Sequence, residues 1–223
     1  MARVRLSVLA AGLLLAAACG GEATPVAIQP GPASLAQLTG PWHAEPFALD
    51  PVLRSRVEQT CRRDMERRPE SVAALVDVRG ASVAIVRMVG PGAGVCDALQ
   101  VLPSGEVTGA GGGWTAGDAE QLPAIGGSEL ADPQVGSVGG GELKVQGFSV
   151  VGRAGGQIAA VVIEPAGIPP ILATLENGWF AGWWPTIVPP NQLGNPDLAP
   201  NVVVRGYDAA GALVDEVQTL SAE

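Results

Sequence analysis

The dipeptide Asn177-Gly178 constrains the fold of this chain more than any other feature of its sequence. An Asn-Gly pair between two apolar runs predicts a two-residue type I′ hairpin turn, because both central residues of that turn need positive φ. The turn also sets the register of the two strands. We therefore expect Glu176 to lie opposite Trp179, and the pairing to continue outwards through residues 171–184.

Strand alternation divides the aromatic residues of this hairpin between two faces. Phe180 and Trp184 share a face with apolar residues, which predicts a position in the core. Trp179 and Trp183 share the other, mixed face. Two indoles on one face favour either a platform that binds a sugar or a protein, or a pair buried beneath the amino-terminal part of the chain. Both interpretations are open from the sequence.

Similar hairpin signals recur around the turn residues at 153–156 and 208–210 and predict about six strands within residues 143–223. The chain has 31 glycines and 19 prolines among 223 residues. This is about twice their usual share, and it disfavours a helical bundle. We expect residues 143–223 to form a carboxy-terminal β domain resembling a sandwich, within a mainly β or α+β fold.

The chain begins with two arginines, Arg3 and Arg5, followed by an apolar run over residues 6–18. Such a run spans about 20 Å as a helix, which is short of the ~30 Å hydrocarbon core of a membrane. A charged start, a short apolar middle and small residues at the end predict a secretory signal peptide over residues 1–18.

The sequence AAAC at residues 16–19 resembles the lipobox of bacterial lipoproteins, although its first alanine stands where leucine is commonest. The resemblance implies cleavage before Cys19, fatty acylation of that residue, and anchoring of the chain at the extracytoplasmic face of the cell membrane. Two or three acyl chains suffice for durable anchoring. The alternative is an ordinary signal peptide that contains a cysteine. Residues 19–41 contain several prolines and no apolar periodicity, and they predict a flexible tether.

Two cysteines, Cys61 and Cys96, remain when Cys19 is set aside. An even pair in an oxidising compartment predicts a disulfide. The chain has no CxxC motif, so neither a redox site nor a zinc site is indicated. The alternative is two free thiols.

Asp50 and Pro51 predict the start of a helix, since Asp is a good N-cap and Pro suits the first helical position. Apolar residues then recur every four positions, and Cys61 belongs to this stripe. Three strand-like runs follow, at 71–78, 82–89 and 95–102. Residues 42–108 are therefore expected to form a small domain in which a helix covers an antiparallel sheet and a disulfide joins the two.

Residues 109–142 are rich in glycine and contain no phosphate-loop motif. The composition predicts a linker or a long irregular loop between the two domains. A ligand-binding loop is the alternative.

Catalytic motifs are not found in this sequence. His43 is the single histidine, in a loop segment before the first predicted helix, and neither G-x-S-x-G nor HExxH occurs. Asp77 and Glu164 lie in or beside apolar strands, and we expect both at strand ends facing water. If they were buried instead, they would be candidates for acid chemistry. No metal site and no cofactor are expected. The formal net charge of −9 disfavours nucleic-acid binding.

The segments ATLENGWFAGWWP and YDAAGALV resemble the tail of uncharacterised secreted proteins of high-GC bacteria, a resemblance that implies no activity. We therefore expect a membrane-anchored, non-catalytic binding or interaction protein of the cell envelope. Its expected partners are membrane lipid through Cys19 and an envelope protein or glycan. The alternatives are carbohydrate or cell-wall binding through Trp179 and Trp183, and a hydrolase that uses two carboxylates.

Overall fold

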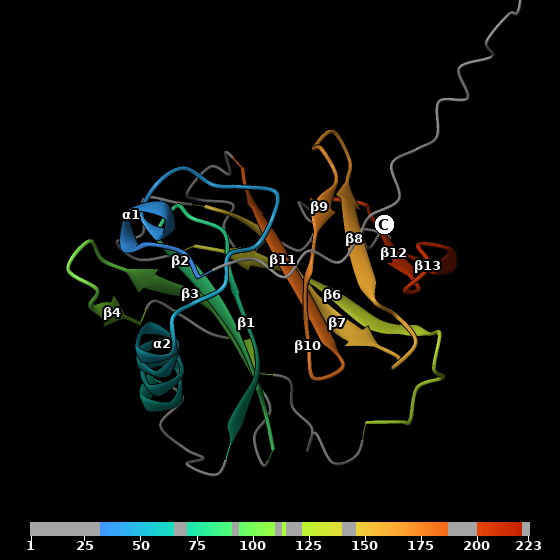
Figure 1. Cartoon of the computed structure of the whole chain (residues 1–223), viewed down its shortest axis with the longest axis horizontal. Coiled ribbons are helices and arrows are strands. Elements are labelled where there is room, and N and C mark those ends of the chain that lie inside the picture. Colours follow the sequence, from blue (N-terminus) through green and yellow to red (C-terminus); the bar gives the residue numbers. More distant parts are fainter. Residues whose placement is uncertain are drawn as a thin grey trace, which may run out of the picture.

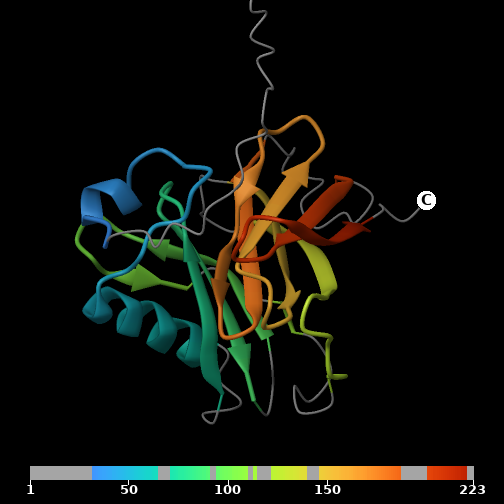
Figure 2. The same ribbon diagram turned by 45° about the vertical axis from the view of Figure 1, so that its right-hand side comes forward.

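The chain folds into four stacked layers, a helix layer followed by three antiparallel sheets (Figures 1 and 2). The computed structural model describes residues 32–64, 71–90, 94–109, 113–114, 122–139, 146–186 and 200–219. The fold is mainly β with an α+β amino-terminal part, as predicted. The predicted signal peptide, Cys19 and tether residues 19–31 lie outside the described residues. Within the described ranges, no helix has both the length and the apolar character needed to span a membrane.

Helix α2 (Pro51–Asp64) begins where the sequence predicts it to begin. The carboxylate of Asp50 accepts hydrogen bonds from the backbone N–H groups of Val52 at 2.9 Å and Leu53 at 3.1 Å. These bonds satisfy two donors that have no partner inside the helix. The helix presents an apolar face to the first sheet through Leu53, Val57 and Cys61.

The first sheet has the order β1-β2-β3-β4, with β5 also paired to β3. Its strands are β1 (Val72–Val78), β2 (Val83–Val89), β3 (Gly94–Val101), β4 (Val107–Thr108) and β5 (Gly113–Trp114). The three predicted strands are confirmed to within a residue at each end. They are apolar on both faces because one face packs against α2 and the other against the second sheet.

A disulfide joins Cys61 of α2 to Cys96 of β3, with the two Cα atoms 5.8 Å apart. Both cysteines are buried in the core between the helix and the first sheet. The predicted disulfide is confirmed.

The short helix α1 (Leu35–Leu38) lies inside the segment expected to be a tether. A capping box between Ser34 and Gln37 starts the helix. Leu38 is only 2% exposed and packs in the same core as the disulfide. The prediction of a flexible tether is therefore wrong for its last part, because apolar side chains there are buried against the first sheet.

The second and third sheets contain four strands each, in the orders β10-β11-β7-β6 and β13-β12-β8-β9. The second sheet consists of β6 (Leu130–Val138), β7 (Gly147–Ala154), β10 (Thr174–Glu176) and β11 (Trp179–Pro185). The third consists of β8 (Ala160–Pro165), β9 (Ile171–Leu172), β12 (Val202–Tyr207) and β13 (Leu213–Thr219).

The Asn-Gly turn has positive φ at both central residues, 49° at Asn177 and 74° at Gly178, as a type I′ turn requires. Strands β10 and β11 have the predicted register near the turn, with the pairs Glu176–Trp179, Leu175–Phe180 and Thr174–Ala181. The continuation of this register to residue 171 is wrong. Beyond Thr174 the chain crosses to the third sheet, where Leu172 pairs with Val162 of β8.

Strand β6 lies in the glycine-rich stretch predicted to be a linker, so that prediction is wrong for residues 130–138. The strand pairs with β7 along its length, with an irregularity between Ala131 and Gln134. Pro133 falls within this irregularity and on an edge strand, where its missing N–H removes no necessary ladder bond.

Strands β7 and β8 were expected to form a hairpin around residues 153–156, and that expectation is wrong. The turn instead carries the chain from the second sheet to the third. Gly155 permits the crossing, since a Cβ there would lie 2.0 Å from the carbonyl oxygen of Gly126.

The second sheet is buried on both faces, which explains the density of aromatic residues on β11. Phe180 and Trp184 pack against the third sheet, at 0% and 2% exposure, as predicted. Ala181 and Trp183 pack against the first sheet and are 0% exposed. The two parts of the chain are therefore joined by an apolar layer rather than separated by a linker.

Candidate functional site

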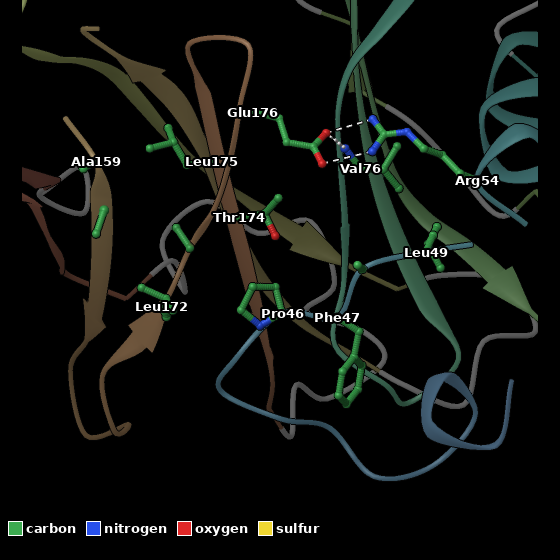
Figure 3. A pocket seen from close by; sticks show the side chains of 13 residues that line it. Pro46, Phe47, Leu49, Arg54, Val76, Ala159, Leu172, Thr174, Leu175 and Glu176 are labelled. Atoms are coloured by element: carbon green, nitrogen blue, oxygen red, sulfur yellow. Dashed lines mark hydrogen bonds and ion pairs between the residues drawn. The ribbon is translucent and has the colours of Figure 1, made fainter. Parts of the chain in front are cut away.

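A cleft of about 460 Å³ opens where the first sheet meets the edges of the other two (Figure 3). Two walls are built by segments far apart in the sequence. One comprises residues 46–49 together with Arg54 and Val76, and the other comprises residues 159–160 and 172–176. Most of the lining is apolar. Its hydrogen-bonding side chains are Arg54, Thr174 and Glu176.

The segment before α2 forms one end of the cleft because it is tied to strand β1. The backbone N–H of His43 donates to the carbonyl of Arg79 at 2.8 Å, and that of Phe47 donates to the carbonyl of Val78 at 2.8 Å. The N–H of Leu172 donates to the carbonyl of Ala44 at 3.2 Å. These bonds connect the first and third sheets and hold Phe47 at the mouth of the cleft (Figure 3).

An ion pair between α2 and the Asn-Gly hairpin closes the other end (Figure 3). The guanidinium of Arg54 donates to both carboxylate oxygens of Glu176, at 3.0 Å and 2.8 Å. Glu176 also accepts a bond from the backbone N–H of Val76 at 3.4 Å. The bonds to Glu176 are the main cause that raises the pKa of Arg54 above its ordinary value, while burial opposes them.

A buried polar network lies behind Thr174. The hydroxyl of Thr174 donates to Asp77 at 2.6 Å, and the Nε of Arg79 donates to the same carboxylate at 3.0 Å. Arg79 also donates to the backbone carbonyls of Ala44 at 2.6 Å and Ala181 at 3.3 Å. The side chains of Asp77 and Arg79 are 0% exposed. Both charges are thus compensated where water does not reach them.

The structure corrects the expectation that Asp77 faces water. Asp77 points from β1 into the layer between the first and second sheets, and its carboxylate is fully used by Arg79 and Thr174. Glu164 is half-buried and forms an ion pair with Arg205 of the neighbouring strand. Neither acid lies free in the cleft.

Trp179 and Trp183 do not form an exposed platform. Trp183 is 0% exposed and lies under the first sheet, with Trp42 packed edge-on at 6.5 Å between ring centroids. The indole N–H of Trp42 donates to the backbone carbonyl of Trp183 at 2.9 Å. Trp179 is half-buried beneath the guanidinium of Arg87. Of the two interpretations left open by the sequence, the structure supports burial beneath the amino-terminal part of the chain and not an exposed ligand platform, because the first sheet covers this face.

His43 lies at the edge of the cleft segment, exposed to solvent, with its ring 5.0 Å from that of Phe47. Among the residues that the structure describes, no group of three or more histidine, cysteine, aspartate or glutamate side chains is placed to hold a metal ion. The chemistry that the cleft offers is apolar contact, one hydroxyl, and an ion pair whose two charges satisfy each other.

Sequence reasoning missed the cleft, since its walls combine residues from five separate stretches of the chain. One partial signal was present. The hairpin register placed Thr174 and Glu176 on the mixed face beside Trp179, and both side chains do point towards the first sheet. The partner residues Arg54 and Asp77 carry no local signal of that kind.

Comparison with known protein families, with characterised proteins and with solved structures finds no match to this chain.

Proposed function

We propose that this chain is a non-catalytic binding protein of the cell envelope, held at the extracytoplasmic face of the membrane by lipid on Cys19. Its ligand would be an extended, uncharged and mainly apolar segment of another envelope polypeptide. The observation that carries the proposal is the apolar cleft between the edges of the first and second sheets.

Two edge strands border this cleft. Strand β1 forms one edge of the first sheet, and β10 forms one edge of the second. In a two-residue hairpin the pair flanking the turn is hydrogen-bonded, and bonded and non-bonded pairs then alternate. Leu175 is therefore in a non-bonded pair, so its N–H and C=O point away from β11 and towards the cleft. An extended peptide is the ligand that uses such an edge, by adding a strand to it.

The charge and size of the cleft agree with this ligand. Arg54 and Glu176 already neutralise each other, so a ligand with a net charge gains little there. A volume of about 460 Å³ lies within the usual range for specific binding sites, and apolar walls with a few polar groups are typical of them. The disulfide between α2 and β3 fixes one wall, which lowers the entropy lost on binding.

The two alternative functions are less well supported. Sugar stacking needs exposed aromatic faces, and Trp183 is completely buried. Hydrolysis by two carboxylates needs two acids that are free to exchange protons with a substrate. The acids in and behind the cleft, Glu176 and Asp77, are each held by an arginine.

Selection from a phage-displayed library of random peptides against the purified chain tests the proposal. We expect the selected peptides to be uncharged and rich in apolar residues. Ala159→Trp, which fills the cleft, should abolish their binding. Ala209→Trp places the same side chain on the exposed β12–β13 turn and should leave binding unchanged. Peptides that bind both variants equally, or a selection that enriches none, would refute the proposal.

The anchor is tested separately by growing cells with an alkyne-tagged fatty acid. Labelled chain at the membrane is expected for the natural sequence, and unlabelled, released chain for Cys19→Ala. The same absence of label in both would remove the lipid anchor from the proposal and leave the cleft untouched.

A further inference from the structure

A second region, on the opposite side of β1 from the cleft, contains a buried arginine that has no charge partner among the residues that the structure describes. Arg87 lies on β2 between Leu75 of β1 and Val95 of β3 and faces the second sheet. It is only 4% exposed. Its guanidinium carbon lies 4.2 Å from the centroid of the Trp179 ring, a cation–π contact.

Other arginines in this layer have acceptors, and Arg87 differs from them. Arg79 has a carboxylate and two carbonyls. Arg153 donates to Asp132 at 3.0 Å and to the carbonyl of Pro123 at 2.7 Å. In the part of the chain that the structure describes, Arg87 has neither an ion pair nor a hydrogen bond, and its Nε atom is buried without an acceptor.

A buried guanidinium in this state is unfavourable, and the ring of Trp179 offsets only part of the loss of hydration. Burial lowers the pKa of Arg87, and the positive charge of Arg153 lowers it further. A negative group would offset the desolvation penalty through its attraction to the guanidinium and would give the buried Nε–H an acceptor. The local charge therefore favours an anion, in a chain whose overall charge is −9.

The surrounding geometry suits an oxyanion. Trp179 and Arg153 are paired neighbours on β11 and β7, and their side chains lie on the face that Arg87 approaches. Asp132 and Pro123 hold the fork of Arg153 in place. Trp179 and Val95 are half-buried, so the region reaches the surface at the seam between the two sheets. Guanidinium groups bind carboxylate and phosphate through two parallel hydrogen bonds.

We propose that this seam is an anion-binding site, in which Arg87 binds a phosphate or carboxylate group through its fork, Trp179 forms one wall and the ion pair of Arg153 and Asp132 lies beside it. The site is separate from the cleft and does not depend on the function proposed for it.

Thermal unfolding of the full chain in sodium phosphate, sodium acetate and sodium chloride at equal ionic strength and pH 7 tests the proposal. We expect the midpoint to rise with phosphate or acetate concentration beyond the rise in chloride, and the more effective anion identifies the group that the site prefers. Titration followed by tryptophan fluorescence should show a saturable change that is lost in Trp179→Phe. Arg87→Met should weaken the apparent affinity at least about tenfold.

The matched control is Arg205→Met, which removes an arginine from a surface ion-pair network and should keep the anion response. Phosphate stabilises most proteins weakly by exclusion from their surface, so an equal response in natural chain and Arg87→Met would overturn the proposal. The absence of an anion response in the natural chain would overturn it as well. If Arg87→Met were then also less stable than the natural chain in chloride, Arg87 would have a carboxylate partner within the chain. If Arg87→Met does not fold, Arg87→Lys keeps the charge without the fork, and an undiminished affinity there would also overturn it.

Discussion

The buried pair of Asp77 and Arg79 gives the sharpest prediction about stability. In Asp77→Ala the guanidinium of Arg79 stays in a site with 0% exposure and loses its counter-charge. Breaking a buried pair from one side costs about 3–5 kcal/mol, and the hydroxyl of Thr174 also loses its acceptor. At the usual entropy of unfolding for a chain of this size, such a loss lowers the melting midpoint by roughly 10 °C.

A double-mutant cycle shows whether the loss comes from the pair itself. Arg79→Met removes the charge, and it also deprives the carbonyls of Ala44 and Ala181 of a donor, which adds about 1–3 kcal/mol for each buried carbonyl. The double variant Asp77→Ala/Arg79→Met should be less destabilised than the sum of the single variants, by about 0.5–3 kcal/mol. Urea unfolding followed by circular dichroism measures all four chains. If the losses of the two single variants add up to that of the double variant, or if Asp77→Ala loses less than about 1 kcal/mol of stability, the proposed role of this network is refuted.

Three further predictions concern the core. Replacing Cys61 and Cys96 by alanine should lower the free energy of unfolding by about 4 kcal/mol, which is the loop entropy expected for a sequence separation of 35. Urea unfolding of the natural and the substituted chain under identical oxidising conditions measures this loss. Gly147→Ala should lower the free energy of unfolding by about 1–3 kcal/mol through overpacking, because its Cβ would lie 2.1 Å from a backbone carbonyl oxygen. The control is Gly156→Ala, whose Cβ would have open space around it. Equal melting midpoints for the two variants would contradict the packing. Trp183→Ala should cost about 3–5 kcal/mol and reduce the near-ultraviolet circular dichroism, whereas a loss below about 1 kcal/mol would mean that this side chain is not buried.

Local chemistry made part of the fold predictable. The Asn177-Gly178 turn, the Asp50 N-cap and three of the five strands of the first sheet depend on neighbours in the sequence, and all appear as expected. The disulfide was also predictable, because one cysteine pair remains when Cys19 is set aside and Cys61 belongs to the apolar stripe of the predicted helix.

Competition between distant partners decided the parts that were mispredicted. Ile171 and Leu172 have the same apolar character whether they pair with β11 or with β8, and the third sheet takes them. Strand β6 was not predicted because it contains Pro133 and lies in a glycine-rich stretch, a composition that indicates a loop; the residues form an edge strand with an irregular register instead. The strand propensity of a segment does not indicate which sheet edge is available to pair with it.

The candidate sites follow the same division. The mixed face of β11 was visible in the sequence, but whether solvent or another sheet covers Trp183 depends on how the first sheet docks. Arg54 meets Glu176 across 122 residues of chain, and no periodicity connects them. Arg87 appears in the sequence as a single polar interruption of an apolar strand, and only the structure shows that it lacks an acceptor among the described residues.

Hydrogen–deuterium exchange on the purified chain, with and without a selected apolar peptide, tests the proposed binding function most directly. The peptide should slow exchange along β10 (Thr174–Glu176), with the amide of Leu175 as the strongest case, and at residues 47–49 on the opposite wall. Protection confined to other surfaces, with the Leu175 amide exchanging at its original rate, would contradict strand addition in the cleft.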